Sequence, residues 1–203
     1  MAYFDIDLKE HILTDLEDIS ERLTRQYKHP AGLKWVILAA DSALYHSMIM
    51  VLKNTDLSGV WKIPEPRNAA GDINPFDAKA FLIGFHDALK AVQDASKMSG
   101  YVGAKPLSIA AADVEKLKEY HENRNSIVHH GPVSWSIHVL VAMEHALAVL
   151  PVIEFLLLQS GRVGLIEGEV SRLKGAIQRI RATIAANPEY QEMQRQAAKV
   201  PPV

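Results

Sequence analysis

The chain of 203 residues contains no cysteine, and aromatic residues make up only 7% of it. Without cysteine there are no disulfides and no thiolate metal sites, so the core must form by packing alone, which a chain of this length can achieve. No series of aromatic residues alternates with basic ones to stack bases. The net charge is −2, which gives no global attraction to nucleic acid. Any contact with RNA must therefore come from a local patch.

Several functional motifs are also missing. There is no glycine-rich loop that could cradle phosphates and no Gly-x-Ser-x-Gly turn, which excludes nucleotide hydrolysis by such a loop and the common hydrolase scaffold. Residues Met1–Lys9 are acidic and lack the basic region followed by an apolar region that marks a secretory signal. We therefore expect a cytoplasmic protein.

Hydrophobic periodicity of the helical kind covers most of the chain, and no convincing alternation typical of strands occurs. With 48% hydrophobic and 23% charged residues, the composition is that of one globular domain. We predict an all-α, up-and-down bundle of about six helices over residues 1–187, followed by a polar tail over 188–203. The expected helices cover about residues 5–27, 31–54, 75–99, 108–128, 135–159 and 163–186.

Two of these helices leave an alternative open. The helix over 135–159 is apolar enough to span a membrane, but Glu144 and His145 near its middle would be costly in hydrocarbon, so we expect a buried core helix and no membrane partner. The helix over 163–186 carries apolar residues at alternating steps of three and four, which is a heptad seam. That seam could pack on the bundle or on a second copy of the chain.

The segment from His121 to Pro132, which reads His-Glu-Asn-Arg-Asn-Ser-Ile-Val-His-His-Gly-Pro, is the most informative part of the sequence. Arg124 can direct two N–H groups to a phosphate, His129 can move a proton near neutral pH, and Asn125 can hold either of them in place. The simpler interpretation is a polar helix end, where cations complement the helix dipole.

The pattern Arg124-Asn125-x3-His129 resembles the Arg-(four to six residues)-His signature of HEPN domains, a superfamily of helical proteins common among prokaryotic toxins and defence proteins. The resemblance continues through Pro132 and the pair Trp135-Ser136 at the start of the next helix. It departs at His130, where relatives often carry an aromatic residue. Motif and flank together cover about residues 119–137.

This resemblance implies a metal-independent endoribonuclease in which the RNA 2′-hydroxyl attacks the neighbouring phosphate. The reaction needs a proton acceptor, a proton donor and positive charge against the phosphorane, roles that His129 and Arg124 would fill with Asn125 orienting them. No cofactor is expected, and the direction of proton transfer stays open. The implied partners are RNA, a second copy of the chain and an antitoxin or regulatory protein. The alternatives are a non-catalytic dimeric module that binds RNA, nucleotide or protein, and a structural interaction protein.

Helix geometry constrains how the motif can work. At 3.6 residues per turn Asn125 and His129 share a face, whereas Arg124 and His129 point away from each other. Either the last turn loosens before Gly131, or the site combines residues of two protomers, as in the family's usual dimer. We therefore predict a two-fold homodimer whose paired Arg124 and His129 side chains line a shared groove.

Two residues of the second helix are candidates for a supporting role. Asp41 interrupts an apolar run, and a buried carboxylate needs a partner, so we predict a pair with Arg124 or His129. The alternative is that Asp41 faces solvent or makes a local hydrogen bond. Tyr45 lies one turn further along the same face and could line the cleft, or it could be a packed core tyrosine.

His121 and His130 flank the motif and are the remaining supporting candidates. His121-Glu122 begins like the helix motif of zinc proteases, but Asn125 stands where that motif needs its second histidine. His129 and His130 are adjacent and so point in different directions, and no carboxylate cluster indicates paired magnesium ions. The sequence therefore predicts no metal site.

Overall fold

The computed structural model of the chain describes residues 7–25, 31–56, 58–62, 65, 67–74, 81–129 and 138–199, and over these residues it confirms the all-α class. Eight helices lie within the described residues. They are α1 (Leu8–Arg25), α2 (Ala31–Leu52), α3 (Phe85–Gln93), α4 (Ala95–Ser99), α5 (Ala111–Val128), α6 (Val139–Leu158), α7 (Glu167–Ala185) and α8 (Pro188–Ala197).

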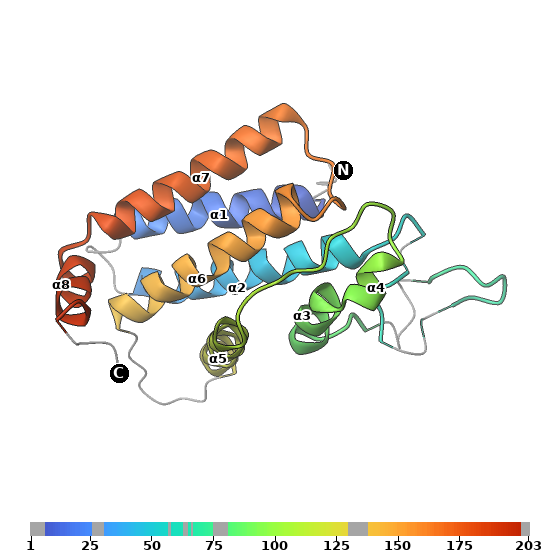
Figure 1. The fold of residues 1–203 in the computed structure, drawn as a ribbon, viewed down its shortest axis with the longest axis horizontal. Helices are drawn as coiled ribbons and strands as arrows, with labels where there is room; N and C mark the ends of the chain where they lie inside the picture. Colours follow the sequence, from blue (N-terminus) through green and yellow to red (C-terminus); the bar gives the residue numbers. More distant parts are fainter. Residues whose placement is uncertain are drawn as a thin grey trace, which may run out of the picture.

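The long helices form the body of the molecule. Helix α2 contacts α1 on one side and α6 on another, while α7 covers α1 (Figure 1). Helix α5 runs across this layer, where it touches both α2 and α6, and α3 lies beside it against α2. The motif helix therefore lies against the middle of the bundle, and not at its end.

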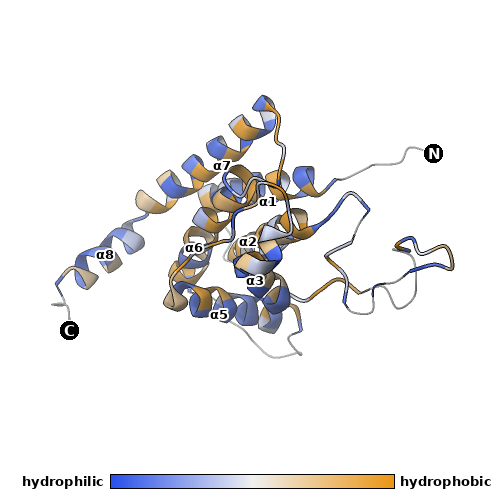
Figure 2. Cartoon of the chain, turned by 45° about the vertical axis from the view of Figure 1, so that its right-hand side comes forward, coloured by the Kyte–Doolittle hydropathy of each residue, from blue (hydrophilic) through white to orange (hydrophobic). Residues whose placement is uncertain are grey.

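The core is made by the expected apolar stripes. Ile12, Leu16, Ile19 and Leu23 of α1 are fully buried, as the helical periodicity predicts. The seam of α7 packs on α1 of the same chain, with Leu173, Ile177, Ile180 and Ile184 buried. Of the two partners that the sequence left open for this helix, the structure therefore shows the bundle itself. Figure 2 shows the contrast between the largely apolar α6 and the hydrophilic α8 at the edge.

Two helices, Gly32–Leu52 and Val139–Leu158, are long and apolar enough to cross a membrane by length and composition. Both occupy central positions, and they pack on each other and on the surrounding helices. A core helix of a soluble protein passes the same test, so this finding leaves the question of a membrane as the sequence left it.

The single helix predicted over 75–99 is wrong in its described part. Residues Phe81–Ile83 are extended and pair with the preceding loop, where the N–H of Lys62 donates to the carbonyl of Phe81 at 2.8 Å and the N–H of Ile83 to that of Val60 at 2.9 Å. The helical part is then divided at Asp94, whose side chain accepts two backbone N–H groups of α4. The N-cap preference of aspartate therefore prevails over a continuous helix.

The C-terminal helices also differ from their expected bounds. Helix α6 begins at Val139 after the extended His138, whose ring accepts the N–H of Leu140 as an N-cap, and the start expected at 135 lies outside the described residues. The tail predicted over 188–203 is mostly exposed as far as residue 199, where the description ends, but its first 10 residues form α8. The side chain of Asn187 caps this helix and proline occupies its first turn, a start signal that the sequence contains.

Candidate functional site

The centre of the candidate site is the carboxylate of Asp41, buried in the middle of α2. Its Oδ1 lies 2.9 Å from Nδ1 of His121, and its Oδ2 lies 3.5 Å from Nε of Arg124. The predicted pairing of Asp41 with Arg124 is thus confirmed. The closer partner is His121, one turn earlier on α5. A buried carboxylate with a partner for each oxygen is a satisfied charge that fixes both side chains of α5 against α2.

Asn125 takes the position that the sequence analysis expected beside the arginine. Its Oδ1 accepts a hydrogen bond of 3.0 Å from Nη1 of Arg124. The guanidinium is therefore held from two sides, by the carboxylate at Nε and by the amide at Nη1. With 34% of its side chain exposed, Arg124 still reaches the surface.

His129 lies at the C-cap of α5, where its N–H still bonds to the carbonyl of Asn125 at 2.9 Å. The helix is regular up to Val128, so its last turn does not loosen before the histidine. The His129 side chain is exposed and makes no hydrogen bond or ion pair with any residue that the structure describes. The arrangement within one chain therefore does not bring His129 into the Asp41 group.

Aromatic and charged neighbours complete the surroundings of His121. Phe85, the first residue of α3, stacks on the His121 ring with centroids 4.1 Å apart and planes 6° from parallel. His86 approaches the same ring edge-on, and its Nε2 lies 3.0 Å from Oε1 of Glu122. The hydrogen bond from His86 lowers the pKa of Glu122. Sequence reasoning did not identify Phe85, because the helix expected there began about ten residues earlier.

The remaining supporting candidates behave differently. The Tyr45 hydroxyl donates to the carbonyl of Ile83 at 2.6 Å, and burial raises its pKa, so this tyrosine ties α2 to the extended segment before α3. Of the two alternatives for Tyr45, these contacts fit the packed core tyrosine. His130 lies outside the described residues, as do Pro132 and the Trp135-Ser136 pair of the resemblance.

A second polar pair lies deeper in the bundle. The rings of Tyr120 on α5 and His145 on α6 stack with centroids 4.7 Å apart. Neither the Tyr120 hydroxyl nor Nδ1 of His145 has a hydrogen-bond partner among the described residues. Burial lowers the pKa of His145 to about 3, with the nearby His121 acting in the same direction, so the ring is neutral at ordinary pH. Burial likewise raises the pKa of Tyr120.

A third group, which sequence reasoning missed, joins α1 to α2. His11 and Asp15 are one turn apart on α1, as Ser42 and His46 are on α2, and the packing of the two helices brings all four together. Both i, i+4 spacings are visible in the sequence. Only the packing of α1 on α2 shows that they face each other.

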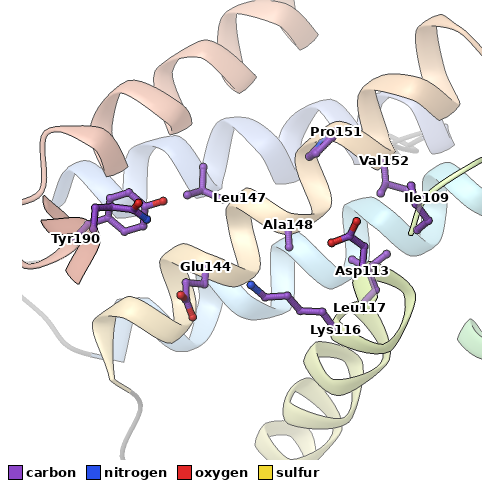
Figure 3. Close-up of a pocket in the computed structure, with 11 residues that line it drawn as sticks. Ile109, Asp113, Lys116, Leu117, Glu144, Leu147, Ala148, Pro151, Val152 and Tyr190 are labelled. Carbon is purple, nitrogen blue, oxygen red and sulfur yellow. The ribbon is translucent and has the colours of Figure 1, made fainter. Parts of the chain in front are cut away.

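A separate hollow of about 380 Å³ lies between α5, α6 and α8 (Figure 3). Its floor is apolar, with Leu147, Ala148 and Val152 from α6, and Tyr190 of α8 closes one end. Lys116 extends from α5 toward the side of α6 that carries Glu144. None of the lining residues belongs to the Arg124–His129 motif, so the hollow and the motif are distinct features of α5.

Comparison with protein-family models, with curated proteins and with solved structures finds no match to this chain.

Proposed function

We propose that the chain is a metal-independent, HEPN-type endoribonuclease whose site is built from Arg124 and His129, with Asn125 orienting the arginine. The observation that carries this proposal is the group around Asp41. A buried carboxylate and an amide hold one guanidinium at the surface of a helix that also ends in an exposed imidazole. A guanidinium held in place in this way is suited to binding the phosphate oxygens of a phosphodiester.

The role of Arg124 follows from its partners. A guanidinium has five N–H donors, and the contacts with Asp41 and Asn125 involve Nε and one hydrogen of Nη1. The remaining hydrogens can bind two oxygens of a phosphate and stabilise the charge that grows on them in the transition state. Because the group is already held in place, little side-chain freedom is lost when RNA binds.

The role of His129 is proton transfer. The RNA 2′-oxygen forms a bond to phosphorus as it gives up its proton to a base, and the bond from phosphorus to the 5′-oxygen breaks as that oxygen accepts a proton. The products are a 2′,3′-cyclic phosphate and a 5′-hydroxyl. An imidazole can perform either transfer near neutral pH, and neither transfer requires a metal ion.

The proposed site is shared between two protomers. Because α5 is regular up to Val128, His129 points away from Arg124 of its own chain, as expected for residues five positions apart. A two-fold axis near the end of α5 would instead place His129 of each chain beside Arg124 of the other. The 46% exposure of Val128, beside His129, is consistent with an apolar contact at this place.

The test is cleavage of a single-stranded RNA by the purified chain and its variants. Arg124→Lys and His129→Ala should each lower the cleavage rate by about 10²–10⁴-fold. Lysine lacks the paired N–H donors of a guanidinium, and alanine cannot transfer a proton. A chelator should leave the rate unchanged, and the product should carry a cyclic phosphate.

Arg181→Ala is the matched control, because it removes a half-exposed guanidinium on α7 that pairs with Glu154. Its rate should equal that of the unmodified chain, and far-ultraviolet circular dichroism should show that all variants remain helical. Full cleavage by Arg124→Lys or His129→Ala would refute the proposal. Retention of RNA without cleavage by the unmodified chain would favour the non-catalytic binding module, which the separation of Arg124 and His129 within one chain also supports.

Asp41 acts in this proposal as a positioning residue. Asp41→Asn keeps the shape of the side chain but removes the charge that holds His121 and Arg124. We expect slower cleavage and a shift of the pH profile of cleavage. A merely structural role would instead lower the amount of folded protein and leave the pH profile unchanged. If both the rate and the pH profile were unchanged, Asp41 would have no part in the site.

A further inference from the structure

The group that joins α1 to α2 has the composition of a metal site. His11, Asp15 and His46 each offer one possible ligand atom, and all of these atoms lie within 4.8 Å of one another. Two imidazole nitrogens and a carboxylate oxygen form a ligand set that divalent transition metals use in catalytic and structural centres. This group shares no residue with the Arg124–His129 motif.

One distance in the group is close to that between two ligands of a bound ion. Nε2 of His11 and Oδ2 of Asp15 are 3.6 Å apart, which is too long for a hydrogen bond. With metal–ligand bonds of about 2.0–2.2 Å, two ligand atoms in a tetrahedral site lie about 3.4 Å apart. His11 and Asp15 therefore already have a suitable spacing, whereas the group as a whole, with ligand atoms up to 4.8 Å apart, must contract around an ion. The His11 and His46 rings, with centroids 4.4 Å apart, are already neighbours.

The polar atoms of the group are incompletely satisfied. Oδ2 of Asp15 is buried and has no hydrogen-bond partner among the described residues. Burial raises the pKa of Asp15 and lowers that of His46, so both environments disfavour the charged side chain. A bound cation would neutralise the carboxylate and would use the lone pair of the neutral imidazole.

Ser42 supplies the outer contact that metal-bound histidines usually have. Its Oγ lies 3.2 Å from Nδ1 of His46, and its hydroxyl acts to lower the pKa of Asp15, against the larger effect of burial. If Nδ1 donates to Ser42, the lone pair of Nε2 is left for a metal. The Ser42 hydroxyl would then orient His46 as a ligand.

We propose that His11, Asp15 and His46 bind one divalent transition-metal ion, with Zn²⁺ as the natural occupant, and that water fills the fourth position. The His11 side chain is 42% exposed, so the ion has a route from solvent and the open position faces outward. The ion ties the N-terminal half of α1 to α2, so it strengthens the largest helix contact of the bundle without entering the RNA site.

The test uses the full chain without a histidine tag, stripped with a chelator and titrated with Co²⁺ and with Zn²⁺. We expect one Co²⁺ per chain with the visible absorption of a four-coordinate ion, displaced by Zn²⁺, and a melting temperature that rises with Zn²⁺ concentration. Asp15→Asn and His46→Gln should each weaken binding by at least about 100-fold, and Ser42→Ala by about tenfold.

His138→Asn is the control, because it removes an imidazole elsewhere but keeps an N-cap acceptor at the start of α6. Its affinity should equal that of the unmodified chain. If His46→Gln fails to fold, His11→Gln tests the same site from the exposed side of α1. The proposal would be overturned if Co²⁺ gave no absorption and Zn²⁺ no rise in melting temperature. It would also be overturned if Asp15→Asn and His11→Gln bound the metal as tightly as the unmodified chain.

Discussion

At the scale of single residues, two histidines of the same motif have very different surroundings. His121 is tied to the buried Asp41 and stacked on Phe85, whereas His129 is exposed at a helix end. The sequence predicts proton transfer for His129 and a supporting role for His121. In the proposed function, His121 therefore supports the site and His129 stays available for a substrate.

The two histidines should respond differently to substitution. His121→Ala should lower the free energy of unfolding by about 1.5–3 kcal/mol, because it removes a hydrogen bond to a buried charge. His129→Ala should change it by less than about 0.5 kcal/mol, as is usual for an exposed residue. Urea denaturation of the three proteins measures both values. Equal losses for the two variants would contradict the assignment of His121 as a support.

His145 makes stability depend on pH. An unfolded histidine titrates near about 6.5, whereas burial lowers the pKa of His145 to about 3. Between these values the unfolded chain carries a proton that the folded chain lacks, so His145 costs about 1.4 kcal/mol of stability per pH unit as the pH falls. Above about pH 7.5 the ring is neutral in both states and has no effect.

His145→Phe tests this dependence, because phenylalanine keeps a ring against Tyr120 but cannot titrate. Between pH 6 and 4, urea denaturation should show a shallower loss of stability in His145→Phe than in the unmodified chain. Other titrating groups, Asp15 among them, are present in both proteins and cancel in the comparison. Parallel pH profiles would show that His145 is not buried in the neutral form.

At the scale of elements, the ends of the helices explain how the bundle is closed. The C-terminus of α2 is capped from a distance by Arg162, whose guanidinium donates to the carbonyls of Val51 and Lys53 at 3.0 and 2.9 Å. The same group lies 4.1 Å from the centre of the Tyr101 ring. The Arg162 side chain thus satisfies carbonyls that a helix end leaves without partners. It also links the end of α2 to Tyr101, which precedes α5, and to the segment that follows α6.

Arg162→Ala should therefore cost about 2–3 kcal/mol of unfolding free energy, because it leaves two carbonyls without their charged donor and removes a cation–π contact. Arg195→Ala is the control, since Arg195 is exposed on α8 and pairs with Glu192 one turn away. Its effect should be within about 0.5 kcal/mol. Thermal unfolding followed by circular dichroism compares the two, and similar melting temperatures would show that the Arg162 cap is not needed.

The helices α2 and α5 agree closely with the bounds 31–54 and 108–128 that the sequence predicted. Proline and glycine next to these segments mark where a helix starts or stops, with His29-Pro30 before the first and Gly131-Pro132 after the second. The prediction was wrong around Phe81–Ile83, where the residues pair with the loop that contains Trp61. Such a long-range pairing leaves no periodic signal in a short segment.

The same distinction applies to the candidate site. A carboxylate within an apolar run indicated that Asp41 needs a partner, and the structure places Arg124 beside it. The closer partner, His121, and the stacked Phe85 depend on how α2, α3 and α5 cross. The group of His11 and His46 depends in the same way on the contact between α1 and α2. The way in which two helices cross cannot be predicted from the sequence of either helix alone.

At the scale of the whole molecule, the proposed function requires two chains. One chain presents a fixed guanidinium on α5 and an imidazole at the end of the same helix, and these point in different directions. We expect analytical ultracentrifugation to show a dimer at the concentrations at which RNA is cleaved. A persistently monomeric chain with full ribonuclease activity would rule out the shared site.

The most direct measurement of the shared site is cleavage by mixed variants. Arg124→Ala and His129→Ala, each inactive alone, are unfolded together and refolded so that the chains exchange. In a mixed dimer, the intact His129 of one chain meets the intact Arg124 of the other, so about a quarter of the activity of the unmodified protein should return. If the mixture stays as inactive as its components although mixed dimers have formed, Arg124 and His129 do not act across two chains on one phosphodiester.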